Sequence, residues 1–327
     1  MKKGLALLFS LILVVSAFAG CASKDATATE GSASTEAVET LDLAFATGGT
    51  SGTYYPLGGA IANVWNDKIA GVNVTIQPAG ASVENINRVS SGEVDLVLAM
   101  NNIADQAYKG EGESFPKALT NFKAIGVVYP EVMHVITTKN SGINSIADLQ
   151  GKKINPGPPG SGTYVTAMEI LKAFGVDDYS SSPGSFSDAV AGLQDGNIDA
   201  AFAVVSFPSS AVVEISTARD IKILEITGDE LAKLQEIIPF AAPFTIAGGE
   251  YNGQDEDAQT IALQAVLYAK DSLDAELVYN LTKEMYENID AISAGHARGK
   301  QISIDRALDG ITTDVHEGAQ KYYDEVK

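Results

Sequence analysis

The chain of 327 residues has little of the chemistry on which many small folds and active sites depend. It contains one cysteine, Cys21, so no disulfide can form within it and the fold must depend on its apolar core. Its three histidines, His134, His296 and His316, are dispersed, and none pairs with another at the spacing of helical metal ligands. We therefore expect neither a metal site nor a cofactor.

Positive charge is also scarce. The 22 lysines and arginines face 42 aspartates and glutamates, which gives a net charge of -20. No basic stripe is present that could neutralise phosphates, which argues against nucleic-acid binding and against charge-driven binding to anionic lipid. The excess of acid favours solubility and says little about the fold.

A hydrophobic run long enough to span a bilayer comfortably is missing, but a shorter one stands at the N-terminus. Two lysines precede an apolar run over about residues 4–19, whereas a span takes roughly 20 apolar residues. A basic start, a short apolar run and small residues before Cys21 are typical of an export signal. Residues 18–21 (FAGC) resemble a bacterial lipobox, in which the cysteine carries diacylglycerol.

These features predict a signal peptide over residues 1–20 and lipidation of Cys21. Residues 21–40 are mostly Ala, Ser, Thr, Gly and acidic residues, a composition that cannot bury enough surface to offset ordering entropy. We expect this segment to be a disordered, lipidated tether. The protein would then be extracytoplasmic and anchored to the cell membrane, in the periplasm or on the outer face of the cytoplasmic membrane.

Short apolar strands alternate with amphipathic helices from residue 41 onward, over a length that suits two domains. This alternation predicts α/β units with largely parallel sheets. After Asp257 the pattern is mostly helical. Strands are expected at 41–46, 72–77, 94–99, 122–129, 132–138, 152–154, 198–205 and 221–224, and helices at 54–69, 83–90, 163–174, 186–195 and 208–215.

The two halves of this pattern resemble each other. Each contains a helix, a glycine turn and a strand that opens on aspartate, over residues 83–96 and 186–200. Each also has a loop of Gly, Ser and Thr that leads into a helix, at 47–53 and 156–163. The duplication predicts two similar domains that face one cleft: residues 41–129 plus 226–327 as domain I, and 130–225 as domain II.

These two loops are the best candidates for ligand contact. Glycine lets the backbone approach a ligand closely, and Ser and Thr cap the helix and offer hydroxyl groups. The exposed N–H groups and the helix dipole then favour a carboxylate or another anion. Each loop alone is equally compatible with an ordinary capped helix, but two in corresponding places favour a binding site.

Catalytic motifs are not matched. The first loop ends without the lysine of a Walker P-loop, and residues 157–162 have the wrong glycine order for a dinucleotide fingerprint. Neither Ser51 nor Ser161 lies in the Gly-x-Ser-x-Gly frame of a nucleophile elbow. We expect no catalytic residues and no enzyme, although an enzyme using the same cleft is an alternative hypothesis.

Several longer motifs resemble the TAXI family, the solute receptors of TRAP (tripartite ATP-independent periplasmic) transporters. The opening signature TGGTSGTYYPLGGA at 47–60 is the longest of them. The likeness continues, in order along the chain, through SVEN at 82–85, GPPGSGT at 157–163, YNGQ at 251–254 and HEGAQKYY at 316–323.

This resemblance implies an α/β fold of the two-lobed, periplasmic-binding-protein type II class, with a ligand cleft between two similar domains. It implies a receptor for a small organic anion, either a glutamate-like amino acid or a C5 dicarboxylate, that delivers its ligand to TRAP permease subunits. A solute-binding module for an ABC importer or a sensor is the alternative. The ligand-binding residues predicted from the loops, the resemblance and the crossover between halves are Thr50, Ser51, Gly52, Tyr54, Gln77, Ser82, Asn101, Asn102, His134, Ser161, Gly162, Thr163, Ser206 and Phe207.

The sequence departs from the family pattern at two places, so the identity of the ligand does not follow from the resemblance. Residues 99–102 lack the acidic residue that is common there, and Ser206-Phe207 stands where a glycine commonly precedes proline. Among the aromatic residues, Tyr54 or Tyr55 should face the cleft and the other the core. Trp65 is expected to pack in the core.

Overall fold

The computed structural model describes residues 40–326. The predicted signal peptide, the tether up to residue 39 and the lipidated Cys21 lie outside these residues. Within the described part, no helix is both long and apolar enough to cross a membrane.

The strands form one ten-stranded mixed sheet in the order β2-β1-β3-β10-β4-β7-β5-β6, with β8 paired to β4 and β9 paired to β10. Strand β1 pairs in parallel with β2 and β3, and β5 in parallel with β6 and β7, whereas β4 and β10 pair antiparallel to all their neighbours. The strands are β1 (Leu41–Ala46), β2 (Val72–Gln77), β3 (Leu96–Met100), β4 (Phe122–Thr138), β5 (Lys153–Asn155), β6 (Ser180–Ser181), β7 (Ala200–Val205), β8 (Ile221–Ile223), β9 (Ala242–Ile246) and β10 (Ala258–Lys270).

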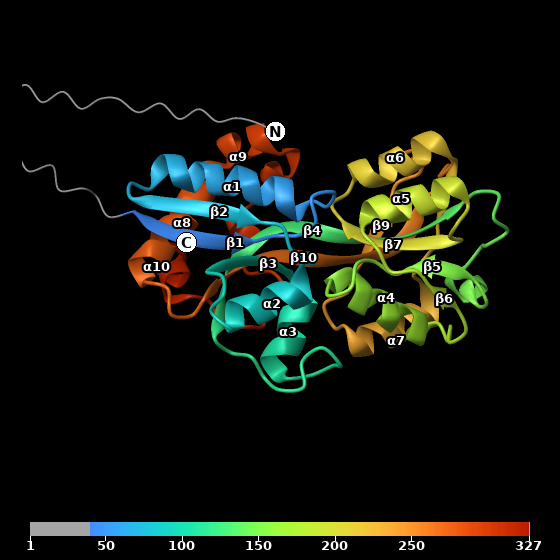
Figure 1. The fold of residues 1–327 in the computed structure, drawn as a ribbon, viewed down its shortest axis with the longest axis horizontal. Helices are drawn as coiled ribbons and strands as arrows, with labels where there is room; N and C mark the ends of the chain where they lie inside the picture. Colours follow the sequence, from blue (N-terminus) through green and yellow to red (C-terminus); the bar gives the residue numbers. More distant parts are fainter. Residues whose placement is uncertain (1–39, 327) are drawn as a thin grey trace, which may run out of the picture. The chain divides into compact units, whose positions relative to one another are not determined.

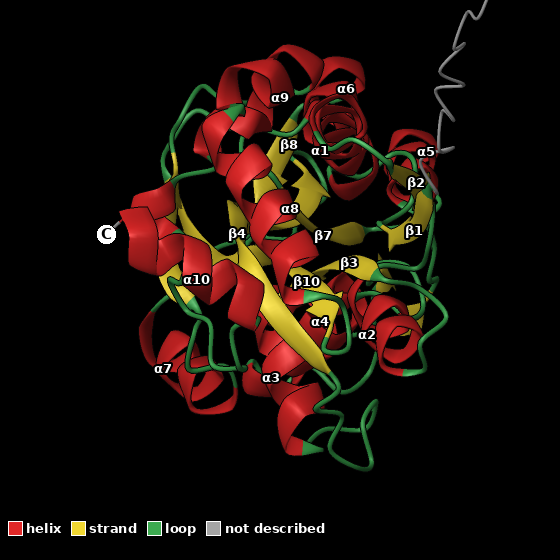
Figure 2. Ribbon diagram, turned by 90° about the vertical axis from the view of Figure 1, so that its left-hand side faces the viewer, coloured by secondary structure: helices red, strands yellow, loops and turns green. Residues whose placement is uncertain are grey.

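Helices cover both faces of this sheet. In Figures 1 and 2, α1 and α9 lie on one face of the strands and α2 and α3 lie on the other. The α-helices are α1 (Tyr54–Lys68), α2 (Ser82–Ser90), α3 (Asn101–Lys109), α4 (Gly162–Ala173), α5 (Phe186–Asp195), α6 (Ser210–Ala218), α7 (Gly228–Ile237), α8 (Ala275–Glu287), α9 (Ile289–Gly295) and α10 (Glu317–Val326). Three short 3-10 helices are η1 (Ile146–Leu149), η2 (Ala297–Gln301) and η3 (Ile304–Arg306).

Two long strands, β4 and β10, run antiparallel through the middle of the sheet and join two lobes (Figure 1). We call the part with β1–β3, α1–α3 and α8–α10 the first lobe, and the part with β5–β7 and α4–α7 the second lobe. Helix α7 packs on α4, and β9 pairs with the start of β10. The expected two-lobed α/β fold of type II is confirmed. The residue boundaries proposed for the two domains stay a prediction.

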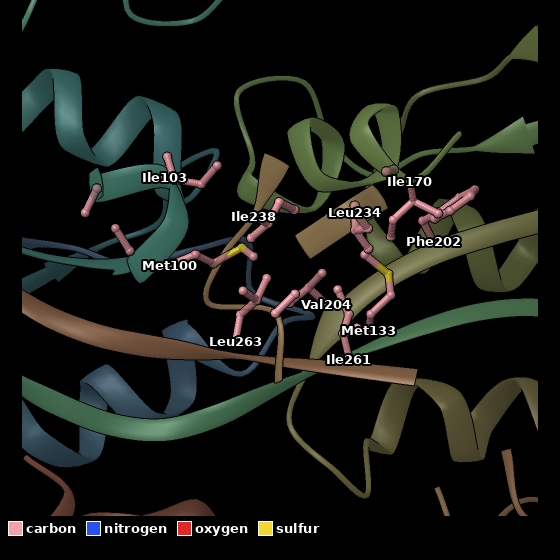
Figure 3. Packing of buried hydrophobic residues seen from close by; sticks show 14 of the residues in the cluster. Met100, Ile103, Met133, Ile170, Phe202, Val204, Leu234, Ile238, Ile261 and Leu263 are labelled. Carbon is pink, nitrogen blue, oxygen red and sulfur yellow. The ribbon is translucent and has the colours of Figure 1, made fainter. Parts of the chain in front are cut away.

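The buried apolar residues continue from one lobe into the other. Figure 3 shows Met100 and Ile103 of the first lobe in the same cluster as Ile170 and Phe202 of the second. A separate cluster lies under α1 and α8, and there the fully buried Trp65 donates from Nε1 to the carbonyl of Leu281 at 2.8 Å. Trp65 is therefore a core residue, as predicted.

Three expectations about the elements were wrong. The two strands expected at 122–129 and 132–138 form one continuous strand, β4. The chain after Asp257 begins with the long strand β10, not with a helix, and the sheet is mixed because these two strands are antiparallel to their neighbours. Both segments are almost continuously buried, and a continuous apolar run has no alternation that distinguishes a strand from a buried helix.

Some elements were not predicted at all. Helices α3 and α7 and strand β9 belong to this group. Strand β9 is mostly exposed, and α7 has a single fully buried residue, Leu234. Their positions depend on pairing and packing with distant segments, which local sequence does not reveal.

Candidate ligand-binding site

A cavity of about 140 Å³ lies between the two predicted loops and the middle of β4. Both lobes contribute to its wall. Its lining residues are Gly48, Gly49, Ser51, Gly52, Thr53, Tyr54, Ala79, Gly80, Ala81, Ser82, Met100, Tyr129, Glu131, Pro158, Ser161, Gly162, Thr163, Ser185, Phe186 and Val204.

Four helices begin at this cavity. The first residues of α1, α2, α4 and α5 are Tyr54, Ser82, Gly162 and Phe186, and all four line it. The first N–H groups of a helix have no partner within the helix, and the helix dipole adds partial positive charge at that end. Among the described residues, no lysine, arginine or histidine lines the cavity. The helix dipoles are therefore the source of positive potential at the cavity, while first-turn N–H groups of α2 and α4 donate to Gly160 O and Ser161 Oγ.

The first loop connects the lobes through a side chain. Thr53 precedes α1 but makes no side-chain capping bond to it. Instead, its Oγ1 donates to Ser206 Oγ at 3.2 Å and accepts from Ser206 N at 3.4 Å. Thr53 thus bonds a residue that follows β7 in the second lobe.

The second loop is organised around its helix cap. Ser161 Oγ accepts from Tyr164 N at 3.0 Å and donates to the carbonyl of Pro158 at 2.7 Å. The neighbouring Gly160 carbonyl accepts from Val83 N and Glu84 N, both at 3.1 Å. The side chain of Ser161 therefore caps α4, while the backbone of the loop bonds the start of α2 in the first lobe.

The two lobes also meet closely at Gly162. A Cβ atom placed there would lie 2.3 Å from Met100 Sδ, 3.0 Å from Ser82 Oγ and 3.1 Å from Ile103 Cγ1. Ser82 Oγ in turn accepts from Met100 N at 3.0 Å. Because glycine has no side chain, the backbone of α4 can lie directly against these side chains of the first lobe.

The start of α2 has an unusual backbone. Ala81, which precedes the helix, has a φ of 75°, a region that residues with a Cβ rarely adopt. Such a conformation costs about 1–3 kcal/mol and persists only where its surroundings hold it. Here it directs the first N–H groups of α2 toward the second loop.

A buried carboxyl group forms the floor of the cavity. The side chain of Glu131 is 3% exposed, and it accepts from Tyr54 OH at 2.8 Å and from Tyr129 OH at 3.2 Å. Burial raises the pKa of Glu131 to about 8, although both tyrosine hydrogen bonds act to lower it. Burial and the nearby Glu131 carboxylate raise the pKa of both Tyr54 and Tyr129 far above the usual value, so their hydroxyls stay protonated and donate.

Sequence reasoning missed Glu131 and Tyr129 as site residues. The available signal was an acidic residue inside the continuous apolar run of β4, where a charge is costly without a function or a partner. Tyr54 lies at the cavity and Tyr55 is only half-buried. The first half of the expectation for this pair is thus met, but the second ring does not enter the core.

Half of the predicted ligand-binding residues meet at the cavity, although their binding roles stay a prediction. Those in its wall are Ser51, Gly52, Tyr54, Ser82, Ser161, Gly162 and Thr163. Those outside it are Thr50, Gln77, Asn101, Asn102, His134, Ser206 and Phe207.

Some residues outside the cavity have evident structural partners. Asn101 joins Gly310 O and Gln264 N, both at 3.0 Å, and Asn102 Nδ2 donates to Thr166 Oγ1 at 3.3 Å. Thr50 is exposed. Gln77 contacts Arg88, and Ser206 contacts Thr53.

His134 lies in an aromatic cluster beside the cavity. Its Nδ1 is 2.9 Å from the Val132 carbonyl, its Nε2 is 3.1 Å from Tyr251 OH, and its ring packs near Phe207. Burial lowers the pKa of His134 to about 4, so the ring is neutral at pH 7. Both ring nitrogens are therefore occupied within the protein.

The two-lobed α/β fold with a cavity between the lobes is the periplasmic-binding-protein fold of type II. Residues 45–326 match the profile of the NMT1-like family, so the chain belongs to that family of periplasmic solute-binding proteins. This membership supports a binding protein of a transport system and confirms the expectation that it is not an enzyme. It also agrees with an extracytoplasmic location.

Solved structures share the fold at low sequence identity. One from Bordetella bronchiseptica RB50 matches with a TM-score of 0.54 and 18% identity, covering 88% of this chain and 98% of that one. Another, described as an L-cystine ABC transporter from Listeria monocytogenes, matches with a TM-score of 0.50 and 14% identity, covering 82% of this chain and 98% of that one. At such identities the likeness establishes the fold alone.

Proposed function

We propose that this protein captures a small organic anion, a glutamate-like amino acid or a C5 dicarboxylate, in its interlobe cavity and delivers it to a TRAP permease. The observation that carries the ligand class is the meeting of four helix N-termini at one cavity without a lining lysine or arginine. Carboxylate groups are stabilised at such helix ends.

Binding would act by closing the two lobes. Direct contacts already join them: Thr53 with Ser206, and Gly160 with the start of α2. A ligand that touches both walls of the cavity stabilises the closed arrangement over an open one, because only the closed arrangement offers all of its contacts. The permease would then recognise the closed form.

Two observations favour different permeases. The ordered motifs over the mature chain resemble TAXI receptors and favour a sodium-coupled TRAP permease. The likeness to the Listeria structure, described as an L-cystine ABC transporter, favours the second candidate, an ABC importer, for the same cavity. Proteoliposomes that hold the permease encoded beside this gene would separate them: uptake driven by a sodium gradient without ATP supports TRAP, and strict ATP dependence supports the importer.

The ligand class is tested on protein that has been unfolded and refolded to remove co-purified ligand. A panel of amino acids and C4 to C6 dicarboxylates is screened by thermal unfolding and native mass spectrometry. A ligand at one hundred times its Kd should stabilise the fold by about 2.7 kcal/mol. A panel without any stabilising acid would contradict the proposed function.

We further propose that Cys21 carries the lipid that anchors the protein. Cys21→Ser should move the protein from the membrane fraction to the soluble fraction and leave ligand affinity unchanged, because residue 21 is separated by sequence from the cavity residues. Cell fractionation and calorimetry measure the two effects. A variant that stays in the membrane fraction would contradict the anchor.

A further inference from the structure

The cavity contains groups of opposite electrical character. Four helix N-termini contribute partial positive charge, and Glu131 contributes a buried carboxyl group. A ligand with only carboxylates is favoured by the first feature and repelled by the second when Glu131 is ionised. A zwitterion satisfies both.

We propose that Glu131 binds the ammonium group of the ligand, and that the cleft therefore selects α-amino acids over matched carboxylic acids that lack the amine. This inference rests on the proposed function and narrows its ligand class. The carboxylate of the ligand meets the helix N-termini, and the ammonium donates to Glu131 on β4.

The neighbours of Glu131 support this assignment. Both of its oxygens already accept from phenol hydroxyls, Tyr54 from α1 and Tyr129 from β4 itself. These donors stabilise the ionised carboxylate and orient it. On the adjacent strand, the residue opposite Glu131 is the apolar Leu263.

No charge within the described protein neutralises Glu131. Arg298 of η2 is a cation whose charge acts on the neighbouring Tyr129 and lowers its pKa, but it is not paired with Glu131. Its guanidinium donates to the carbonyls of Phe207 at 2.6 Å and Pro208 at 3.2 Å. No ion pair involves Glu131 among residues 40–326, so a ligand is the available source of a countercharge.

The direction in which ligand affinity changes with pH distinguishes the two ligand classes. Because burial raises the pKa of Glu131 to about 8, the carboxyl of the empty site is largely protonated at pH 7. An ammonium ligand favours the carboxylate, so its binding releases a proton and its affinity rises between about pH 6 and pH 8. A carboxylate ligand without an amine favours the protonated form, so its affinity falls over the same range.

The experiment compares acids in pairs that differ only by the amine: L-glutamate with glutarate, L-leucine with 4-methylpentanoate, and L-phenylalanine with 3-phenylpropanoate. Calorimetry at pH 6, 7 and 8, in buffers of different ionisation enthalpy, gives affinity and proton release. In any pair that binds, we expect the amino acid to bind about 10- to 100-fold more tightly, the range of a charge-assisted hydrogen bond. Proton release should accompany its binding.

Two variants test whether the preference for the amine and the proton release depend on Glu131. Glu131→Gln keeps the size and one acceptor, and it should abolish the preference for the amine and the proton release. Glu214→Gln, a change of the same charge at an exposed position on α6, should leave both unchanged. If Glu131→Gln does not fold, the preference and proton release of the unaltered protein still test the proposal.

Each outcome bears on the proposal. A clear amine preference with proton release, lost in Glu131→Gln, supports it. Equal or tighter binding of the des-amino acids, with proton uptake, overturns it and leaves the proposed function standing. Failure of all six acids to bind counts against both the proposed function and this inference.

Discussion

The two Gly/Ser/Thr loops, residues 47–53 and 156–163, look alike in sequence but are built differently. In the second loop, Ser161 caps α4 with its side chain, and the backbone carbonyl of Gly160 reaches the other lobe. In the first loop, Thr53 leaves α1 without a side-chain cap and uses its hydroxyl to reach Ser206. The contact to the other lobe therefore comes from the backbone in the second loop and from a side chain in the first.

This difference shows that one composition can serve two purposes. A hydroxyl before a helix satisfies a free N–H group when it folds back, or it bonds a distant element when it does not. The choice sets whether the residue stabilises the folded state as a whole or only the closed arrangement of lobes. Three comparisons of variants test how the loops and the lobe contacts differ.

Gly162→Ala should have the largest effect. Its Cβ would crowd Met100, Ser82 and Ile103 across the lobe boundary, and overpacking of this kind costs about 1–3 kcal/mol. The cost acts on the closed arrangement, so ligand affinity should fall by about 5- to 150-fold. Calorimetry measures it, and small-angle scattering should show a more open liganded protein.

The matched control for this variant is Gly59→Ala in α1, outside the cavity wall. A Cβ there would meet Ile76 Cδ1 at 3.4 Å, an ordinary contact distance. Its affinity should remain close to that of the unaltered protein. Equal losses in the two variants would mean that affinity is sensitive to any added methyl group, and that close approach at Gly162 is not the cause.

Ser161→Ala should reduce the free energy of unfolding by about 1 kcal/mol, because the helix cap is lost. Thr53→Val is the comparison, and it should leave unfolding of the ligand-free protein nearly unchanged, since its hydroxyl makes no cap bond. Urea unfolding measures both. Similar destabilisation by the two substitutions would contradict the different roles assigned to the loops.

The smallest expected effect is the coupling between Thr53 and Ser206. The double-mutant cycle of Thr53→Val and Ser206→Ala should give about 0.5 kcal/mol in ligand affinity, the low end for a hydrogen bond, because the two contacts are 3.2 and 3.4 Å long. Ser206 lies outside the cavity wall, which limits direct effects on the ligand. If the effects of the two single substitutions on ligand affinity simply add, this contact does not assist closure.

Much of the fold could be predicted because its units are local. The loops before α1 and α4, the buried Trp65 and the alternation of strands and helices all follow from composition and spacing over short stretches. The error lay in β4 and β10, where continuous burial removes the alternation that identifies a strand. Those two strands connect the lobes, so the predicted sheet lacked its antiparallel centre.

The candidate site was predicted only in part for a related reason. Residues within the two loops were found, because glycine and hydroxyl residues before a helix leave a local signal. Asn101 and Phe207 were also selected, yet they bond or pack within the protein. Whether a polar or aromatic residue near a strand end faces the cavity depends on lobe packing, which has no local signature.

The sequence by itself determined the acidic character, the absence of a disulfide within the chain and the two Gly/Ser/Thr loops before helices, because these depend on residue type and short spacing. Only the tertiary structure decided that four helices begin at one cavity and that Glu131 lies at its floor. Glu131 is separated from Tyr54 by 77 positions along the chain, and its environment exists only when β4 passes beneath α1. A carboxyl group acquires an altered pKa from burial and from its neighbours, and both are properties of the folded arrangement.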